Sequence, residues 1–514
     1  MKPKSKNKSK VVKITLLSVL LIILVSAIAC NSIPFLNQVS QKGENQGFQI
    51  PQPTEPLSEN DNQETDNEEL EESSTSPDTV GSFQEDVDLV KLFEAFWNAR
   101  ELLHDNYLEQ PIDDQVLANG AIEGLNLFLE GNNASLSEIE LPEDAPTPEE
   151  TAKQAKTPKD VTQAFLPFWE AWNKLSYLEL PEDTTKTTLM RQALTGMVAS
   201  LEDPYTNYFD PDLAEQMNIH LGGEYEGIGA YVDVGLEYLT IISSFEGSPA
   251  DEAGLKPGDQ IIAIDGDDMT GVDPSIALKR VLGDAGTKVI LTIKRENLET
   301  PFDVEIIRRK ITIPNIESEI LEGNIAYLKL LSFYDGGDVA VRNTLDDLLS
   351  KNPKALIFDL RGNGGGFLHT VVNITSEFIE DGNVLIEEFS DGSQKNYPIR
   401  NSKGVALEIP LVVLVDEGSA SASEIFAGAI QDNGRGILVG QTTFGKGSVQ
   451  LPITLPDDQG LIRITIARWL TPNERTIHEI GIEPDFIVEL TEDDFDSDRD
   501  PQLEKAIELL TSNP

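Results

Sequence analysis

The sequence predicts a multidomain α+β chain with a helical N-terminal segment, a small β-domain and an α/β core. Three changes of pattern along the 514 residues indicate this organisation. Residues 85–220 carry apolar and aromatic side chains at helical spacing. Residues 221–310 read as short strands separated by Gly and Pro turns. From residue 311 onward, apolar strands alternate with helical stretches, the pattern of a layered α/β structure.

The first 30 residues have the features of a targeting segment. A lysine-rich run over residues 2–13 precedes an apolar stretch from Ile14 to Ala29, which suits a secretory signal and is short for a membrane span. The stretch ends at Cys30, the only cysteine, and resembles a bacterial lipobox, although Ala27 stands where leucine is usual. We expect a lipoprotein-type signal peptide with Cys30 as the lipidation site; an uncleaved signal anchor is the alternative. Either one places the chain on the extracytoplasmic face of the cell membrane, tethered to the membrane surface.

Residues 31–84 are expected to form a disordered acidic linker. They are rich in Gln, Asn, Glu, Ser, Thr and Pro, and offer too little apolar surface to offset the entropy of ordering. The whole chain carries a net charge of −50, which excludes nucleic acid as a partner because phosphate binding needs a basic surface.

The helical region contains a duplication. The run Phe93–Trp97 is echoed by Phe165–Trp169, and Ala121–Leu125 is echoed by Ala193–Met197, both at an offset of 72 residues. Residues 85–130 therefore form a first helical copy and residues 161–220 a second, joined by a Pro- and Glu-rich linker at residues 131–160. The aromatic spacing is more typical of core packing than of ligand binding.

Residues 221–310 resemble a PDZ domain of the bacterial protease type. The run Ala253-Gly254-Leu255-Lys256-Pro257-Gly258-Asp259 and the order of strands around it carry the resemblance. It implies that a peptide C-terminus adds as a strand beside residues 228–232, with backbone N–H groups near Gly227, Ile228, Gly229 and Ala230 holding its carboxylate. A plain small β-domain with a glycine-rich turn is the alternative.

Two strand–glycine loop–helix units mark the core, which we place at residues 311–490. The strand Ala355–Leu360 precedes Arg361-Gly362-Asn363-Gly364-Gly365-Gly366, in which Gly365 or Gly366 could offer an oxyanion-hole N–H. A P-loop interpretation lacks the following Lys-Ser/Thr. The strand Leu411–Val415 precedes a helix start with serines at 419, 421 and 423, whose spacing does not identify a nucleophile. A serine at a helix start and a desolvated lysine, here Lys446 between two glycines, can together form a hydrolytic nucleophile.

These motifs occur in the order found in the carboxy-terminal processing peptidases, also called tail-specific proteases, and the chain resembles this family of PDZ-containing Ser–Lys serine peptidases from about Phe165 to Leu490. The motifs that carry the resemblance are Asp203-Pro204-Tyr205-Thr206, the PDZ segment, Asp359-Leu360-Arg361 with Gly365-Gly366, Gly418 to Glu424, and Gly445-Lys446-Gly447.

The resemblance implies a crotonase/ClpP-like core and assigns roles to residues. Ser421 would be the nucleophile, with the amide of Ala422 in the oxyanion hole, and Lys446 the general base. Gln450 would orient the lysine, and Asp432 would play a supporting part. Strand alternation would place Lys446, Ser448 and Gln450 on one side.

The chain departs from the family pattern at two places. Gly362 and Gly364 replace residues that are commonly Asn and Pro in the family's loop, and the first helical copy is an addition. Residues 491–514 are expected to be an acidic tail with a short helix.

We therefore predict an exported, membrane-tethered serine endopeptidase that recognises the C-terminal tails of protein substrates. Two alternatives stay open: a non-catalytic PDZ scaffold that binds exported peptide tails, and a Ser–His hydrolase using His369 or His478. No metal or other cofactor is expected, because four scattered histidines and one cysteine do not form a zinc ligand set. The sequence leaves the formation of a homo-oligomer open.

Overall fold

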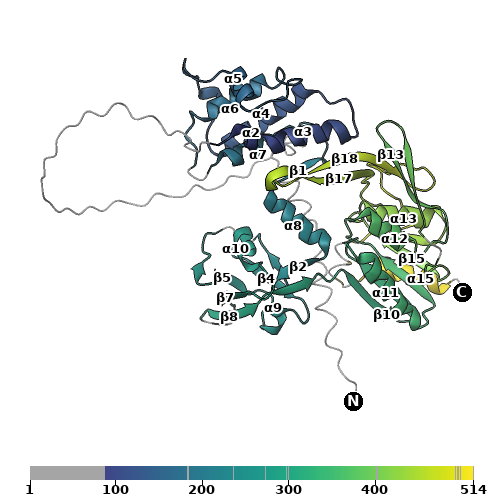
Figure 1. The fold of residues 1–514 in the computed structure, drawn as a ribbon. Coiled ribbons are helices and arrows are strands. Elements are labelled where there is room, and N and C mark those ends of the chain that lie inside the picture. Colours follow the sequence, from purple (N-terminus) through teal and green to yellow (C-terminus); the bar gives the residue numbers. More distant parts are fainter. Residues whose placement is uncertain are drawn as a thin grey trace, which may run out of the picture. The chain divides into compact units, whose positions relative to one another are not determined.

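The computed structural model describes residues 87–512, apart from residues 182–183, 236, 273, 297, 299, 401–402, 492–493, 495–496 and 498. The expectations for the signal segment, Cys30 and the linker at residues 31–84 lie outside the described residues. In the part of the chain that is described, no helix is long and apolar enough to cross a bilayer. The described residues divide into two compact units, one holding residues 98–112 and 205–512 and the other holding residues 87–97 and 113–204 (Figure 1).

The helical unit is built from the two copies of the duplication. Asp113 and Thr185 cap the main helix of each copy by accepting a backbone N–H in its first turn. The first copy gives α2 (Leu89–Leu92), the start of α3 (Glu94–Asn106), whose residues from Asn98 on belong to the other unit, and α4 (Asp114–Gly131); the second gives α6 (Leu166–Leu175) and α7 (Lys186–Ala199).

The two copies pack against each other through equivalent residues. The ring centres of Phe93 and Trp169 lie 4.8 Å apart, and those of Phe165 and Trp97 lie 5.0 Å apart. Phe165 is the equivalent of Phe93, and Trp169 is the equivalent of Trp97, so the two contacts are reciprocal. Helices α4 and α7 approach closely at equivalent glycines, since a Cβ built at Gly196 would lie 2.5 Å from the nitrogen of Gly124. The unit is therefore an internal pseudo-two-fold pair whose aromatic side chains form its core.

Residues 131–160 are not the bare linker that the sequence suggests. They contain a 3-10 turn (Leu136–Glu138) and α5 (Pro148–Gln154), which a capping box between Thr147 and Glu150 begins. Thr151 is buried and donates to the side chain of Asn173 on α6 at 2.8 Å. The Pro and Glu residues that suggested a linker supply the start of a short packed helix.

The PDZ segment is a small antiparallel sheet with two short helices. Its core is formed by buried side chains such as Ile241, Ile261 and Leu291. Asp259 is fully buried and paired with Arg295 at 2.6 Å. The strand order is β3 (Ala230–Asp233), β4 (Thr240–Ser244), β5 (Gln260–Ile264), β7 (Lys288–Lys294) and β8 (Phe302–Ile307), with β6 (Asp267–Asp268) on β5, α9 (Pro249–Glu252), α10 (Pro274–Val281) and the pair β2 (Glu224–Gly227) and β9 (Arg309–Thr312).

The core contains a six-stranded sheet that is parallel except at one edge. Its two central strands are buried at every residue, as expected for a parallel sheet covered on both faces. The order is β10 (Ile316–Leu321), β11 (Ile325–Leu330), β12 (Ala355–Asp359), β15 (Leu411–Val415), β16 (Ile437–Gly440) and β19 (Phe486–Ile487), with β10 antiparallel.

Helices cover both faces of this sheet. One face packs under α11 (Gly337–Ser350), α12 (Leu368–Thr375) and α13 (Ala422–Asp432). The other face packs against α15 (Pro501–Ser512), with Ala506 fully buried among sheet residues. The segment expected to be an acidic tail is therefore, over α15, an integral layer of the core.

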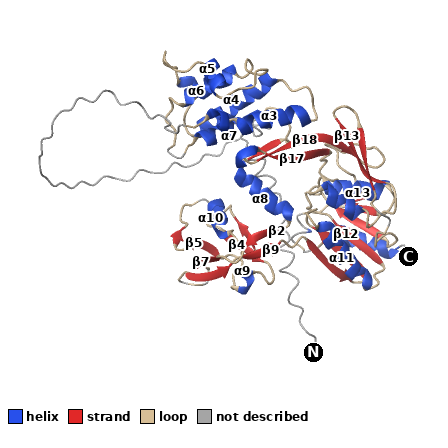
Figure 2. Cartoon of the chain, viewed as in Figure 1, coloured by secondary structure: helices blue, strands red, loops and turns tan. Residues whose placement is uncertain are grey.

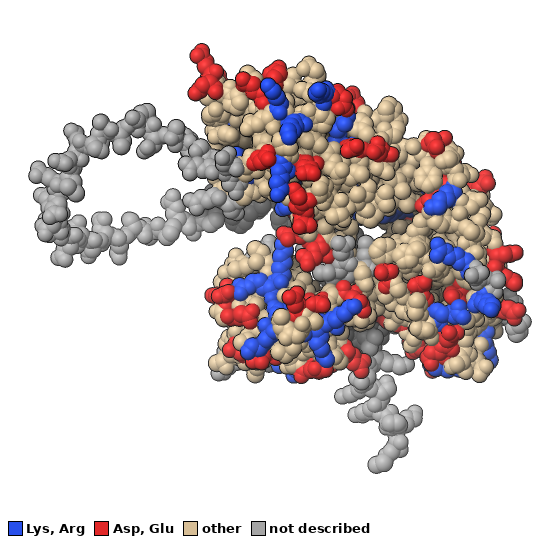
Figure 3. Space-filling view, viewed as in Figure 1, with Lys and Arg blue, Asp and Glu red and all other residues tan. Residues whose placement is uncertain are grey.

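A second, antiparallel sheet carries the strand that follows the lysine motif. β18 (Leu461–Leu470) pairs with β1 (Asn207–Phe209), β13 (Asn383–Phe389) and β17 (Ser448–Thr454), and β14 (Gln394–Pro398) completes the sheet. The remaining regular elements of the described residues are α8 (Pro211–Gly222) and a 3-10 turn (Pro456–Asp458). Figure 2 distinguishes the helix-only part of the chain from its strand-rich parts, and Figure 3 shows acidic and basic side chains interspersed over the face drawn.

The close approach of α4 and α7 yields a stability prediction. In Gly196→Ala the new methyl group would lie 2.2 Å from the carbonyl oxygen of Gly120, so the helices must separate. We expect a loss of about 1–3 kcal/mol in the free energy of unfolding. Urea denaturation followed by tryptophan fluorescence reports on this unit, because three of the four tryptophans lie there. The matched control is Gly131→Ala at the end of α4, where a Cβ meets nothing within 4 Å; an equal loss in both variants would contradict the close-packing argument.

Candidate active site

The candidate site lies where two neighbouring strands end. β12 and β15 run parallel, with Asp359 opposite Leu414, so the loops that follow them leave from the same edge of the sheet. We call residues 361–366 the glycine loop and residues 416–421 the serine turn. Asp416 joins them, since its Oδ1 accepts from the N–H of Gly362 at 2.8 Å and of Gly418 at 3.0 Å. Burial raises the pKa of the Asp416 carboxyl.

Ser421 stands at the end of the serine turn, as the N-cap of α13. Its backbone has φ 54° and ψ −112°, a conformation that costs energy for a residue with a side chain and that is concentrated at functional sites. The residue is half-buried, and the helix that follows it begins with Ala422. The free N–H groups of this helix start favour negative charge beside the serine.

The two flanking serines hold the loops together. The hydroxyl of Ser419 donates to the carbonyl of Leu360, and that of Ser423 donates to the carbonyl of Asn363, both at 2.8 Å. Both serines are fully buried. The structure therefore separates the three serines that spacing alone could not, because two of them form structural bonds to the chain that follows β12, one to Leu360 and one to Asn363.

Gly365 lies directly against Ser421. A Cβ built on Gly365 would lie 2.8 Å from the Cβ of Ser421 and 2.9 Å from the nitrogen of Ala422, and its φ of +104° itself favours glycine. The N–H of Gly365 donates to the Oδ1 of Asn363 at 2.9 Å. Among the described residues, the N–H groups of Gly366 and Ala422 have no hydrogen-bond partner. Of the two glycines expected to offer an oxyanion N–H, only Gly366 has that group unoccupied.

Glu424 is a site residue that the sequence analysis did not assign. Its carboxylate is fully buried and accepts four hydrogen bonds. Oε2 accepts from the N–H of Ser421 at 2.8 Å and of Lys446 at 2.9 Å, and Oε1 accepts from the N–H of Gly445 at 2.7 Å and the hydroxyl of Thr443 at 2.6 Å. The capping-box spacing from Ser421 to Glu424 was the available signal, but it predicts only the first of these bonds.

One carboxylate oxygen thus binds both the serine and the lysine segments. The backbone nitrogens of Ser421 and Lys446 can be no farther apart than the sum of their two distances to Oε2 of Glu424. Burial raises the pKa of Glu424, although the four hydrogen bonds act in the opposite direction. Glu424 is the structural link between the proposed nucleophile and base.

Lys446 lies in the loop just before β17 and is half-buried. Its carbonyl accepts from Nε1 of Trp469 at 2.9 Å. Its Nζ lies 5.2 Å from the centre of the Tyr205 ring, so the aromatic residue of the Asp203-Pro204-Tyr205-Thr206 motif contacts the amine. An aromatic face favours the protonated amine, and this interaction competes with desolvation.

Gln450 lies on β17, where its Nε2 donates to the hydroxyl of Ser448 at 2.8 Å. The expected alternation does not extend to Lys446, because β17 begins at Ser448 and its register shifts between Val449 and Gln450. Strand geometry therefore does not fix the lysine; Glu424 and Trp469 hold its backbone instead.

Asp432 is the last residue of α13, at the opposite end from Ser421. Its carboxylate pairs with Arg475 and accepts from the N–H of Asn473 at 2.8 Å. At 1.5 Å per residue, a helix of this length separates the two positions by about 16 Å. Asp432 therefore fixes the turn that contains Asn473 and Arg475, and it lies far from Ser421.

The two histidines considered for catalysis have other surroundings. His369 is exposed, and its Nε2 lies 3.4 Å from Oδ1 of Asp335. His478 contacts the ring of Tyr205 edge-on at 6.4 Å, and its buried Nδ1 has no hydrogen-bond partner within the described residues. The described hydrogen bonds join neither histidine to Ser419, Ser421 or Ser423.

The expected carboxylate cradle of the PDZ segment spans the end of β2 and the start of β3. Gly229 has φ +81°, and its carbonyl accepts from the hydroxyl of Ser248 at 2.7 Å. Burial raises the pKa of the Tyr225 phenol to about 12, while backbone hydrogen bonds from Ala230 and Gly229 act in the opposite direction. Two of the four amides expected to hold a peptide carboxylate, those of Gly229 and Ala230, thus face the phenol oxygen of Tyr225. The side chain of Ile228, which lies between Gly227 and Gly229 in the sequence, is buried.

Among the described residues, no group of three or more His, Cys, Asp or Glu side chains could hold a metal ion. The arrangement instead offers a hydroxyl, an amine and free backbone N–H groups, the components of acyl transfer.

Comparison with known proteins identifies the family. Peptidase family S41 matches residues 324–488, and a PDZ domain matches residues 241–295. The carboxy-terminal processing protease CtpB of Bacillus subtilis is 32% identical over 400 residues, which cover 77% of this chain and 79% of that protein. The carboxyl-terminal-processing protease of Synechocystis sp. is 33% identical over 68% of this chain and 84% of that protein. The chain belongs to the carboxy-terminal processing proteases.

A third member of the carboxy-terminal processing proteases, CtpA of Bacillus subtilis, is 36% identical over 310 residues, 60% of this chain and 66% of that protein. The resemblance found in the sequence is confirmed, and the chain is a serine-type peptidase. The fold class, with its helical N-terminal region, PDZ domain and S41 catalytic domain, is also confirmed.

The contact between Gly365 and Ser421 yields a prediction for catalysis. Gly365→Ala places a methyl group against the serine Cβ and the Ala422 nitrogen, and forces alanine into a positive φ. We expect cleavage of an unfolded protein such as casein to fall by about 10²–10³-fold, the loss typical of a damaged oxyanion hole. Gly364→Ala is the matched control, since a Cβ there meets nothing within 4 Å. Similar cleavage by both variants would show that the glycine loop does not shape the site.

The Glu424 hydrogen bonds yield a second prediction. Glu424→Gln replaces an acceptor oxygen with an NH₂ group that faces donors, so at least one buried group loses its partner. We expect a loss of about 1–3 kcal/mol in the free energy of unfolding, with a fall in kcat. Glu417→Gln, at an exposed position in the serine turn, removes the same charge and should behave like wild type. Urea denaturation and steady-state cleavage measure the two effects; wild-type kcat in Glu424→Gln would contradict the linking role.

Proposed function

We propose that this protein is an exported, membrane-tethered serine endopeptidase that binds the C-terminal tails of protein substrates through its PDZ domain. Cleavage uses a Ser421–Lys446 dyad and an acyl-enzyme intermediate. The observation that supports the dyad most directly is the shared acceptor, because Oε2 of Glu424 receives the N–H of both residues. Membership of the carboxy-terminal processing proteases supports the reaction class.

In the acylation step, the Oγ of Ser421 attacks the carbonyl carbon of the scissile bond while Nζ of Lys446 takes the hydroxyl proton. Negative charge develops on the carbonyl oxygen and is stabilised by the N–H groups of Gly366 and Ala422. When the C–N bond breaks, the protonated lysine gives its proton to the leaving amine, and the N-terminal part of the substrate stays esterified to Ser421.

In the deacylation step, the neutral lysine takes a proton from a water molecule, whose oxygen attacks the ester carbonyl. The bond from the carbonyl carbon to Oγ of Ser421 then breaks, Oγ receives the proton from Lys446, and the new carboxyl terminus is released. Lys446 must therefore be neutral at the start of each half-reaction, and partial burial favours that form. Gln450, which donates to Ser448 beside the lysine loop, orients the base, and Asp432 supports the fold behind α13.

The PDZ domain supplies substrate selection. The N–H groups at Gly227, Ile228, Gly229 and Ala230 would bind the terminal carboxylate, and the tail would extend as a strand beside β3. Lipidation at Cys30, or an uncleaved anchor, would keep the enzyme at the extracytoplasmic face of the membrane, where exported proteins present their C-termini.

Substitution of the dyad tests the proposal against both alternatives. Ser421→Ala and Lys446→Ala should each abolish tail cleavage with an unchanged unfolding transition, whereas His369→Ala and His478→Ala should retain it. Mass spectrometry of fragments from an exported-protein mixture gives the readout. A fluorophosphonate probe that labels wild type but not Ser421→Ala supports the enzyme, and tail binding without labelling supports the scaffold. Normal cleavage by Lys446→Ala would exclude the dyad.

A further inference from the structure

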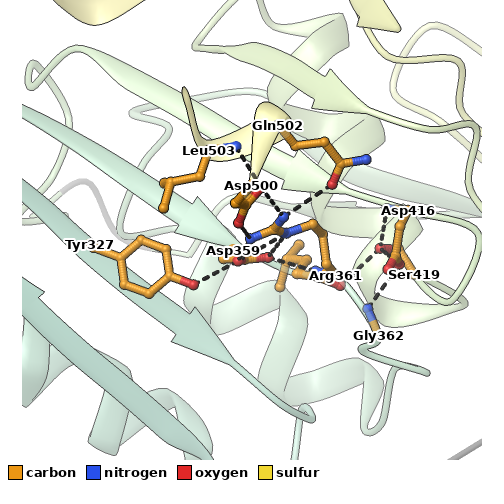
Figure 4. A network of polar contacts seen from close by, with 10 residues as sticks. Tyr327, Asp359, Arg361, Gly362, Asp416, Ser419, Asp500, Gln502 and Leu503 are labelled. Atoms are coloured by element: carbon orange, nitrogen blue, oxygen red, sulfur yellow. Dashed lines mark hydrogen bonds and ion pairs between the residues drawn. The ribbon is translucent and has the colours of Figure 1, made fainter. Parts of the chain in front are cut away.

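A cluster around Arg361 joins the first residue of the glycine loop to the C-terminal segment of the chain. Figure 4 shows the guanidinium between two carboxylates, with Tyr327 on one side and Gln502 on the other. Nη2 of Arg361 lies 2.7 Å from Oδ2 of Asp359, and Nη1 and Nη2 each lie 2.9 Å from an oxygen of Asp500. Nη1 also donates to Oε1 of Gln502 at 3.1 Å. Asp500 and Gln502 lie 139 and 141 residues from Arg361 along the chain.

The contacts are of a strong kind. Both terminal nitrogens of the guanidinium donate to Asp500, one to each carboxylate oxygen. This bidentate arrangement fixes the orientation of the Arg361 side chain as well as its distance from Asp500. The Arg361 side chain is only 13% exposed and that of Asp359 is fully buried. Burial opposes ionisation of Asp359, but Arg361 and Lys329 outweigh it and hold the pKa of this carboxyl below its ordinary value. The cluster is therefore a partly buried charge network rather than a surface ion pair.

Asp500 has a position fixed independently of Arg361. Its Oδ1 also accepts the N–H of Leu503 at 2.9 Å, which makes Asp500 the cap of α15. Behind the cap, Ala506 is buried in the sheet face, and Leu503 and Ile507 pack beside it. The apolar contacts of α15 hold the carboxylate in place, so the carboxylate can in turn hold the arginine.

Arg361 is connected to the reacting groups through the glycine loop. The next residue, Gly362, donates to Asp416 of the serine turn, and the carbonyl of Asn363 accepts from the N–H of Ala420 at 3.0 Å. Four residues after Arg361, Gly365 lies against Ser421. Displacement of the arginine at the start of this short loop would shift the N–H groups at its end.

We propose that Asp500 and Gln502 are positioning residues for catalysis, through which the C-terminal segment holds Arg361 and sets the glycine loop against Ser421. This inference rests on the proposed function for its catalytic consequence, since the loop supplies an oxyanion N–H. Its structural part, the coupling of α15 to the glycine loop, does not depend on that function.

The test is a matched pair of substitutions in the full chain. Asp500→Asn keeps the shape of the side chain and an oxygen that can cap α15, but removes the charge that faces Arg361. Glu508→Gln removes a carboxylate from the same helix, at an exposed position paired only with Lys505 among the described contacts. We expect kcat for casein cleavage to fall about 10- to 100-fold in Asp500→Asn with KM within about twofold of wild type, and no change in Glu508→Gln.

A double-mutant cycle identifies the route. If Asp500 acts through Arg361, Asp500→Asn should have little further effect on kcat in an Arg361→Lys background, because lysine cannot form the fork. Gln502→Ala should lower kcat in the same direction by a smaller factor. Asp500→Glu, which restores the charge, should recover part of the lost kcat.

Hydrogen–deuterium exchange separates this proposal from the proposed function. We expect amides of residues 360–366 to exchange faster in Asp500→Asn than in Glu508→Gln, with the sheet strands unchanged, whether or not the wild type cleaves casein. An inactive wild type with this exchange pattern would refute the dyad and leave the coupling standing. Unaltered exchange of the loop and wild-type kcat in Asp500→Asn would overturn the coupling, as would a uniform rise in exchange across the core.

Discussion

A buried carboxylate with four donors around it is the interaction on which the site depends. Glu424 is placed by the first turn of α13, yet two of its hydrogen bonds come from Gly445 and Lys446, which lie more than twenty residues away. A charge in such a place is costly unless donors surround it, and each donor here belongs to backbone or hydroxyl groups that also need a partner. The carboxylate and the two segments therefore stabilise one another, and the serine and lysine loops cannot move apart without exposing an unsatisfied charge.

The parallel sheet gives this interaction its setting. β12 and β15 are buried on both faces, so their carboxyl ends are fixed by packing, and the two loops that follow are held together by Asp416, Ser419 and Ser423. The strained backbone at Ser421 can persist because these bonds determine its neighbours on each side. Rigid strands thus support a candidate site in which Ser421 and Lys446 both lie outside the strands, at a helix start and in a loop.

The helical unit is held together differently, by packing between equivalent residues of its two copies. Equivalent aromatic rings from the two copies interlock, and equivalent glycines let α4 and α7 approach. A single copy would expose its aromatic side chains and the glycine face of its main helix to water. The second copy covers these surfaces of the first, and the first covers those of the second. This gives a physical reason for the presence of the additional helices.

The sequence by itself determined the order of domains and the residue types of the site, because periodicity, glycine-rich turns and the Ser and Lys motifs are local signals. It indicated Ser421, Lys446 and the glycine loop, but it could not choose among three serines without a family resemblance. Only the tertiary structure decided that Ser419 and Ser423 hold loops, that the N–H of Gly365 is already bonded, and that Glu424 links the backbone of Ser421 to that of Lys446. It also decided that the supposed tail contributes Asp500 to Arg361. Each of these depends on contacts between residues distant in sequence, which no local pattern records.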